Sequence, residues 1–118
     1  MADSGISREQ ALKLLEENLS QLNLRRHSLA TEAIMRALAD DRGEDADLWG
    51  ITGLLHDLDY EKTGDDPRSH GVKSAEMLKG MLPEEALHAI ASHNAEHTGV
   101  ERNSDLDHLL AAAESLTG

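Results

Sequence analysis

The stretch Gly50-Ile51-Thr52-Gly53-Leu54-Leu55-His56-Asp57 decides the fold class of this 118-residue chain. Its first six residues are small or apolar, which predicts a buried helix over about residues 46–58. It ends in a histidine and an aspartate, and a buried position admits such a pair only with hydrogen-bond partners or a metal ion. Adjacent helical side chains point about 100° apart, so both can reach one ion only near the helix end.

Helical periodicity continues on both sides of this stretch. Apolar residues spaced three and four apart predict further helices over about 8–22, 25–41, 69–80, 83–95 and 105–117. Their ends carry local signals, which are a capping box at Ser7 and Gln10, Gly43 as a stop, Pro83 as a start and Ser104 as a cap. Strand signals are absent. The predicted fold class is therefore all-α, a compact bundle of about six helices in a single domain over residues 1–118.

Two predicted apolar faces bear on the packing. The first helix should bury Leu12, Leu15, Leu19 and Leu22. The second should bury a face that is rich in alanine, made of Leu29, Ala30, Ala33, Ile34, Ala37 and Leu38.

Composition excludes several classes of function. The net charge is 11 − 23 = −12, which disfavours binding to nucleic acid polymers or anionic membranes. There are no cysteines, so thiolate metal sites, disulfides and cysteine nucleophiles are excluded. No apolar run approaches the roughly 18 residues of a membrane span, and the first five residues lack the features of a signal peptide. We therefore expect a cytoplasmic protein.

Seven histidines are more than a small helical protein needs for folding. His27, His56, His70, His93 and His97 fall near predicted helix ends, where side chains of different helices can converge. His88 and His108 look like surface residues. Imidazole and carboxylate without thiolate suit divalent Fe, Mn, Zn, Co or Ni. His93 and His97 are spaced i, i+4, a spacing that binds zinc only with a third ligand from elsewhere.

In their order along the chain, these residues resemble the HD superfamily of metal-dependent phosphohydrolases, whose pattern is a His, an adjacent His-Asp and a distal Asp. His27 matches the first position and His56-Asp57 the signature pair. Ser69-His70-Gly71 and Ser92-His93-Asn94 resemble the two further histidine motifs of members with an expanded, often two-metal site. The similarity runs from about residue 24 to the end. The resemblance divides the single domain into an N-terminal helix, residues 1–23, and the helices that carry the metal site, residues 24–118.

Two departures from the pattern stand out. The distal motif reads Ala113-Glu114-Ser115-Leu116-Thr117-Gly118, with Glu in place of the expected Asp. The extra methylene moves the carboxylate by about 1.5 Å, which could weaken activity in a site that tolerates roughly 0.5 Å. Relatives also usually continue beyond this motif. The chain is therefore either a minimal version of the domain or a fragment whose missing C-terminal helices leave the last helix partly uncovered. We expect copies of the chain to associate through that apolar face, as a homo-oligomer.

The resemblance implies one or two divalent ions, drawn from Fe, Mn, Zn, Co, Ni or Mg. His27, His56, Asp57 and Glu114 would hold one ion, and His70 and His93 a second, with Asp57 bridging. Water activated by the metal would attack the phosphorus of a nucleotide or another small phosphoester or phosphoanhydride. Arg26, Lys62 and Arg68 are the expected phosphate contacts, and Asp57 and Lys62 are also expected among the catalytic residues. Asp59 is expected to act as a general acid or to hold a ligand histidine.

Several alternatives stay open. The metal site could serve a sensing or scaffold domain in which Glu114 has ended catalysis. The chain could also be a metal-free interaction module, or a di-iron oxygenase related to the HD proteins. Tyr60 could stack on a base or simply pack. His97 could support a ligand from behind or replace Glu114.

Overall fold

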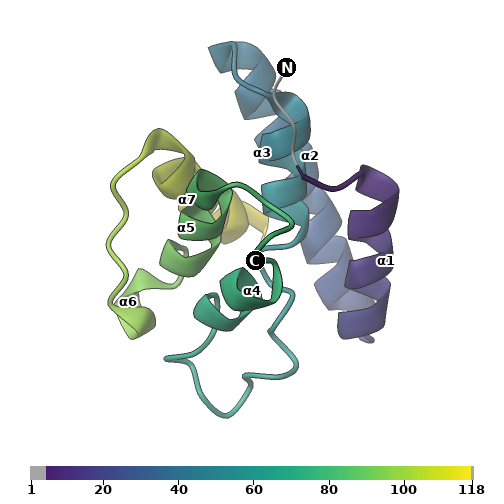
Figure 1. Ribbon diagram of the computed structural model, residues 1–118, viewed down its shortest axis with the longest axis vertical. Helices are drawn as coiled ribbons and strands as arrows, with labels where there is room; N and C mark the ends of the chain where they lie inside the picture. The colour runs from purple at the N-terminus through teal and green to yellow at the C-terminus, as the bar shows by residue number, and fades with distance from the viewer. Residues whose placement is uncertain (1–4, 118) are drawn as a thin grey trace.

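A computed structural model describes residues 5–117 and contains seven helices in that range (Figure 1). They are α1 (Arg8–Asn18), α2 (Leu22–Arg42), α3 (Ala46–Leu54), α4 (Val72–Met77), α5 (Glu84–Ser92), α6 (Ala95–Thr98) and α7 (Asp105–Thr117). No strand occurs among the described residues, where the only β contact is an isolated bridge between Lys79 and Leu82. The all-α prediction is confirmed, with one helix more than the pattern suggested. The first four residues and Gly118, the last residue of the distal motif, lie outside the described range.

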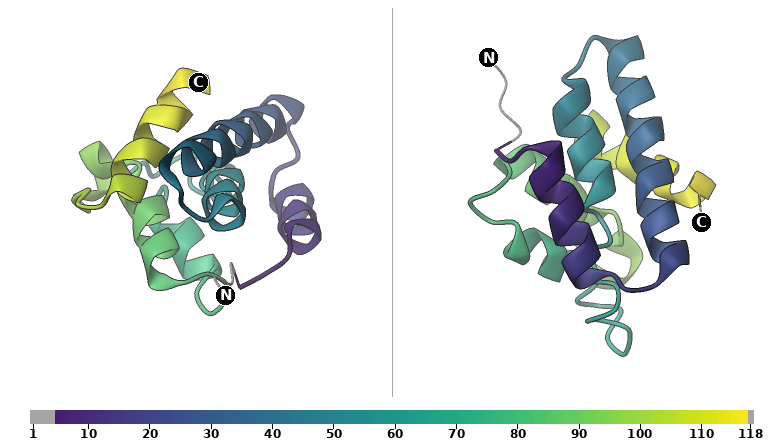
Figure 2. Two further views of the ribbon diagram at one scale, coloured as in Figure 1. Left: turned by 90° about the horizontal axis from the view of Figure 1, so that it is seen from above. Right: turned by 90° about the vertical axis from the view of Figure 1, so that its right-hand side faces the viewer.

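Helix α3 forms the centre of the bundle, as the opening stretch predicted. Every residue from Leu48 to Leu54 is buried. The helix packs against α1, α2, α5 and α7, and it runs beside the long helix α2 in both views of Figure 2. Gly53 permits this close approach, since a Cβ atom there would lie 2.9 Å from Met35 Cγ and 3.1 Å from the Thr31 carbonyl oxygen. The backbones of α2 and α3 therefore pass almost in contact just before His56.

The predicted face of α2 is wrong. Leu29 is 40% exposed, and Ala30, Ala33 and Ala37 also face solvent, while Ile34 and Leu38 are only partly buried. The helix instead buries Leu24, Ser28, Thr31, Glu32, Met35 and Ala39. Thr31 and Glu32 are tolerated because partners reach them, whereas the buried Ser28 hydroxyl has no hydrogen-bond partner among the described residues. Glu32 receives a bidentate pair of hydrogen bonds from Arg8 at 2.7 and 2.8 Å, and Thr31 donates to the His27 carbonyl.

The first predicted helix is too long. Helix α1 begins with the expected capping box at Ser7, but it ends at Asn18 because Leu19 is extended. The Glu61 carboxylate then accepts hydrogen bonds from the amides of Ser20 and Gln21 and holds the turn into α2. Leu22 consequently begins α2 and is 59% exposed instead of lining the α1 stripe.

The third, fourth and fifth predicted helices are also too long. Helix α3 ends at Leu54, so His56 and Asp57 lie in the turns that follow it. The fourth helix begins at Val72 and ends at Met77, and is shorter than predicted. The fifth splits at His93 into α5 and α6, where Asn94 leaves the helical conformation and donates to the Pro67 carbonyl at 2.8 Å. His93 and His97 therefore do not share one helix face.

Helix α7 is better covered than expected. Leu106, Leu110 and Ala113 are buried against the bundle, and the helix packs on α2, α3 and α5. Leu116 is its one large apolar side chain with high exposure, 80%. The uncovered apolar face predicted for this helix is thus absent from the described residues, and association between copies stays an untested prediction. None of the described helices is both long and apolar enough to span a membrane.

Candidate metal centre

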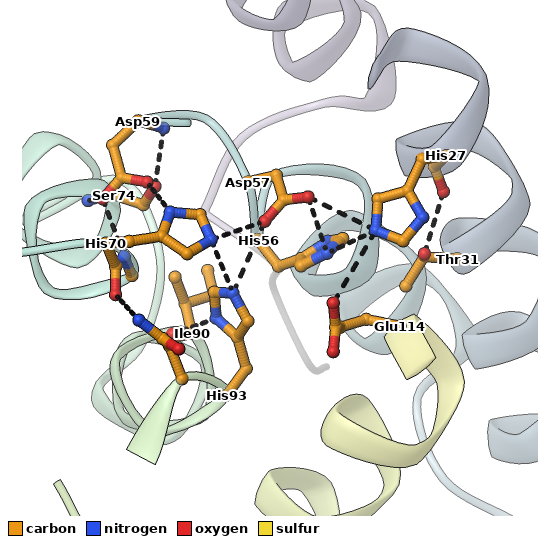
Figure 3. A network of polar contacts seen from close by, with 12 residues as sticks. His27, Thr31, His56, Asp57, Asp59, His70, Ser74, Ile90, His93 and Glu114 are labelled. Atoms are coloured by element: carbon orange, nitrogen blue, oxygen red, sulfur yellow. Dashed lines mark hydrogen bonds and ion pairs between the residues drawn. The ribbon is translucent and has the colours of Figure 1, made fainter. Parts of the chain in front are cut away.

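Four histidines and one aspartate converge where the α3 turn meets α2, α4 and α5 (Figure 3). On one side of Asp57, His27 Nε2 and His56 Nε2 lie 3.2 Å apart, and each is 3.3 Å from Asp57 Oδ2. On the other side, Asp57 Oδ1 is 3.0 Å from His70 Nε2 and 3.4 Å from His93 Nε2, and these two nitrogens are 3.3 Å apart. Asp57 thus belongs to two separate groups of three potential ligands.

The spacing within each group fits a bound divalent ion. Ligand atoms about 2.1 Å from one ion, at angles of roughly 90–110°, lie about 3.0–3.4 Å from one another. Asp57 Oδ1 is buried and has no hydrogen-bond partner among the described residues, which is costly for a carboxylate oxygen unless a cation satisfies it. The residues therefore fit a centre for one or two divalent ions, with Asp57 shared between them.

The ring nitrogen on the far side of each histidine is held by the protein. His56 Nδ1 lies 2.6 Å from the Gly53 carbonyl oxygen, and His93 Nδ1 lies 2.6 Å from that of Ile90. His70 Nδ1 is 2.7 Å from Asp59 Oδ1. Because these oxygens only accept, Nδ1 carries a proton, and Nε2 is the nitrogen left to bind a metal ion.

Electrostatics favour a charged centre. Burial alone would raise the pKa of the Asp57 carboxyl, but the charge of His56 and the other surrounding imidazoles hold it well below its usual range. Burial would lower the pKa of His70, but its contacts with Asp57 and Asp59 outweigh burial and raise the pKa to about 9. Without a metal ion, a proton on His70 balances part of the negative charge. A divalent ion would take its place.

Asp59 holds His70 and does not reach the centre itself. It is fully buried, and its second oxygen accepts from the amides of Gly71 and Ser74 at 2.8 and 2.9 Å. Burial raises the pKa of Asp59, but the contact with His70 and these amides outweigh it and lower the pKa. The carboxylate therefore has no proton to donate near neutral pH, and the geometry fits the ligand-holding alternative rather than the general acid.

Gly71 makes this arrangement possible. Its φ is +94°, in the region that favours glycine, and a Cβ atom there would lie 2.9 Å from the Ile90 carbonyl oxygen and 3.1 Å from His93 Cε1. The same residue donates to Asp59. Any side chain at this position would press on the ligand His93 and on the carbonyl that holds its ring.

Glu114 lies beside the centre but outside the two tight groups. It projects from α7, and its Oε1 is 3.9 Å from His27 Nε2 with 29% of the side chain exposed. Asp57 and His56 lie closer to the same nitrogen, at 3.3 and 3.2 Å. The substitution of Glu for Asp thus leaves the carboxylate at the edge of the centre.

The three predicted phosphate contacts do not come to the centre. Lys62 is exposed and donates to Asn18 at 2.6 Å. The Arg68 side chain is 87% exposed and lies 3.9 Å from Asp66, while Arg26 is exposed on α2. These residues are close to the histidines in sequence, but helical and turn geometry points them elsewhere.

Two cavities adjoin the centre. The larger, of about 410 Å³, is lined by Asn23, Leu24, His27, Asp57, Tyr60, His70, Glu114 and Thr117. The smaller, of about 240 Å³, shares Tyr60 and His70 with it and is also lined by Thr63, Gly64, Pro67, Asn94 and His97. Tyr60 packs edge-on against His70, with ring centroids 5.3 Å apart. His97 therefore lies in the side cavity and outside the two ligand groups.

The sequence analysis missed the ion pair of His88 with Asp107 and the contact of Thr117 with His27. His88, interpreted as a plain surface residue, is half-buried, and its Nδ1 lies 2.7 Å from Oδ2 of the fully buried Asp107. His108 is exposed as expected. Thr117, three residues after Glu114, contacts His27 Nδ1 at 2.8 Å. Its place in the distal motif, on the Glu114 side of the helix, was the one signal that could have pointed to it.

Comparison with known protein families agrees with this geometry. The family model described as HD domain matches residues 24–118, and the chain belongs to this family.

Two curated relatives are similar to it. Ribonuclease Y of Enterococcus faecalis is 37% identical over 100 residues, and Ribonuclease Y 1 of Pediococcus pentosaceus is 31% identical over 96 residues. Each alignment covers 80% of this chain but only 18% of the relative, so the chain spans less than a fifth of their length. No solved structure gave a significant match.

Proposed function

We propose that this protein is a metal-dependent phosphohydrolase that acts on a nucleotide or another small phosphoester or phosphoanhydride. The observation that carries the proposal is Asp57, a buried carboxylate shared by two groups of histidine Nε2 atoms at ligand spacing. A bound divalent ion at such a centre activates water as a nucleophile and stabilises charge on phosphoryl oxygens. Its identity stays open among Fe, Mn, Zn, Co, Ni and Mg.

The roles of the chain's own residues follow from their contacts. His27, His56, His70, His93 and Asp57 would hold the ions, with Glu114 adding a charge at the edge on the His27 side. Asp59 orients His70, while the carbonyls of Gly53 and Ile90 orient the two buried rings. Because ligand positions are fixed before substrate binds, little reorganisation is needed during reaction.

The cavities support a small substrate. The larger cavity opens onto His27, Asp57 and His70 and so can hold a phosphoryl group at the centre. The smaller cavity next to Tyr60 offers room for an attached organic group. No lysine or arginine lines either cavity among the described residues, so the ions themselves would balance the phosphate charge.

Two other functions keep a specific observation in their favour. The relatives named Ribonuclease Y suggest cleavage of an RNA phosphodiester, although a net charge of −12 opposes binding of a polyanion. The position of Glu114, 3.9 Å from His27 Nε2, suits a metal-binding scaffold or sensing domain that has lost turnover.

One screen separates these functions. Untagged protein would be loaded with Mn²⁺, Fe²⁺, Co²⁺ or Mg²⁺ and tested on nucleotides, on small phosphoesters and on a short single-stranded RNA. The proposal predicts release of phosphate or nucleoside from the small substrates and loss of that activity in Asp57→Ala. Cleavage of RNA alone would favour the ribonuclease, and bound metal without any hydrolysis would favour the scaffold.

A further inference from the structure

His27 differs from the other three ligand histidines in what holds its Nδ1 atom. The other rings face carbonyl or carboxylate oxygens, which can only accept a hydrogen bond. His27 Nδ1 faces the Thr117 hydroxyl at 2.8 Å, and a hydroxyl can either donate or accept. The contact alone therefore does not determine which nitrogen of His27 carries the proton.

Thr31 resolves this choice. It is fully buried on α2, and its Oγ1 lies 2.8 Å from the His27 carbonyl oxygen and 3.0 Å from Thr117 Oγ1. The carbonyl can only accept, so the single Thr31 proton is used there, and Thr117 must donate to Thr31. Thr117 then has no proton left for His27, and Nδ1 must be the donor. This direction forms all three hydrogen bonds, whereas the reverse direction loses either the one to the carbonyl or the one between the two hydroxyls.

The support matters because Asp57 favours the other tautomer of His27, with the proton on Nε2. Asp57 Oδ2 lies 3.3 Å from His27 Nε2, and a carboxylate there attracts the ring proton to Nε2. A proton on Nε2 would block metal binding by His27. The alternative acceptors for the Thr117 proton, the carbonyls of Ala113 and Glu114 at 3.3 and 3.1 Å, leave the outcome unchanged because Nδ1 must still donate.

We infer that Thr117, supported by Thr31, is a positioning residue that fixes His27 in the tautomer with the proton on Nδ1 and so keeps Nε2 free for a metal ion. The two hydroxyls join the end of α7 to α2, and they couple the distal Glu114 motif to the first histidine. The inference deepens the proposed metal-centre function and rests on it for its purpose, but the tautomer exists in the metal-free protein and can be measured there.

The direct test is the tautomer of His27 in metal-free protein, read from two-bond ¹H–¹⁵N correlations at a pH where the ring is neutral. Native protein and Thr117→Ser should show the proton on Nδ1. Thr117→Val, which keeps the shape but removes the hydroxyl, should shift the ring toward the Nε2–H form. An unchanged tautomer in Thr117→Val, or an equal shift in Thr117→Ser, would overturn the inference.

A second measurement follows Mn²⁺ binding by calorimetry. Thr117→Val and Thr31→Val should each lower the affinity about 10- to 100-fold, and Thr117→Ser should restore most of it. Thr52→Val is the matched control, since Thr52 is also fully buried and its hydroxyl donates to its i−4 carbonyl, of Leu48, at 2.7 Å instead of bonding to a ligand histidine. An affinity loss in Thr52→Val as large as in Thr31→Val would indicate a packing effect and refute the role. Absence of hydrolysis in all variants would count against the proposed function and leave the tautomer result intact.

Discussion

Binding of a divalent ion should weaken as the pH falls below 9, because His70 must lose a proton before its Nε2 can bind. Burial lowers the pKa of His70, but the close contacts with the charged carboxylates of Asp57 and Asp59 outweigh it and raise the pKa to about 9. At pH 7, two units below that pKa, removing the proton costs about 2.7 kcal/mol, at 1.36 kcal/mol per unit. The apparent affinity should therefore rise on the order of 100-fold between pH 7 and 9 and then level off. Because the side chain is 16% exposed, screening by solvent makes this an upper value.

The assay is calorimetric titration of metal-free protein with Mn²⁺, without oxygen, in pairs of buffers that differ in ionisation enthalpy. Close to one proton should be released from His70 when the group that contains His70 and His93 is filled at pH 7, and the release should fall off above pH 9. In Asp59→Asn the ring loses one of its two carboxylate partners, so the pKa of His70 and the affinity midpoint should both move to lower pH. Equal affinity at pH 7 and 9 with no proton release would refute the reasoning.

Three further predictions follow from the same contacts. His93→Ala should lose one of the two ions and keep the other, since His93 belongs to only one ligand group; elemental analysis that finds both ions retained would contradict this. Gly71→Ala should lower the free energy of unfolding by about 1–3 kcal/mol, because φ +94° with ψ −47° is a sparsely populated backbone conformation, and should also weaken metal binding, as measured by urea unfolding and calorimetry. Burial raises the pKa of Asp107, but the amides of Asn103 and Ser104 outweigh it and lower the pKa, so the carboxylate stabilises the fold above its unfolded pKa of about 4 and loses this effect as the pH falls. Asp107→Asn should therefore lose less stability than the native protein between pH 5 and 3, and an equal loss in urea unfolding would count against it.

Local chemistry made some helix ends predictable. These ends depend on residues that are close together in the sequence. They are the capping box of Ser7 and Gln10, the left-handed Gly43, and the Ser104 hydroxyl that accepts from the Asp107 amide. Other ends depend on distant groups. The start of α4 depends on Asp59, and the break after α5 on the contact from Asn94 to Pro67. No local pattern indicates such partners.

The site divides in the same way. The order of His27, His56-Asp57, His70 and His93 suggested a shared centre, and the fold brings these side chains together. The supports behind the ligands, such as Thr31 and Thr117, come from helices that are distant in sequence and could not be paired in advance. Lys62 was assigned to the centre because it is close to His56 in sequence, and this assignment was wrong. The turn that carries Lys62 directs its ammonium group to Asn18.

The shared carboxylate of Asp57 is the central claim, and metal content measures it most directly. Untagged protein, purified without chelators and then offered Mn²⁺, Fe²⁺, Co²⁺, Ni²⁺ or Zn²⁺, would be analysed by elemental mass spectrometry beside Asp57→Ala. The two ligand groups that meet at Asp57 predict about two ions per native chain and almost none in the variant. Native protein that takes up no divalent ion, or Asp57→Ala that holds as much metal as the native chain, would contradict the account.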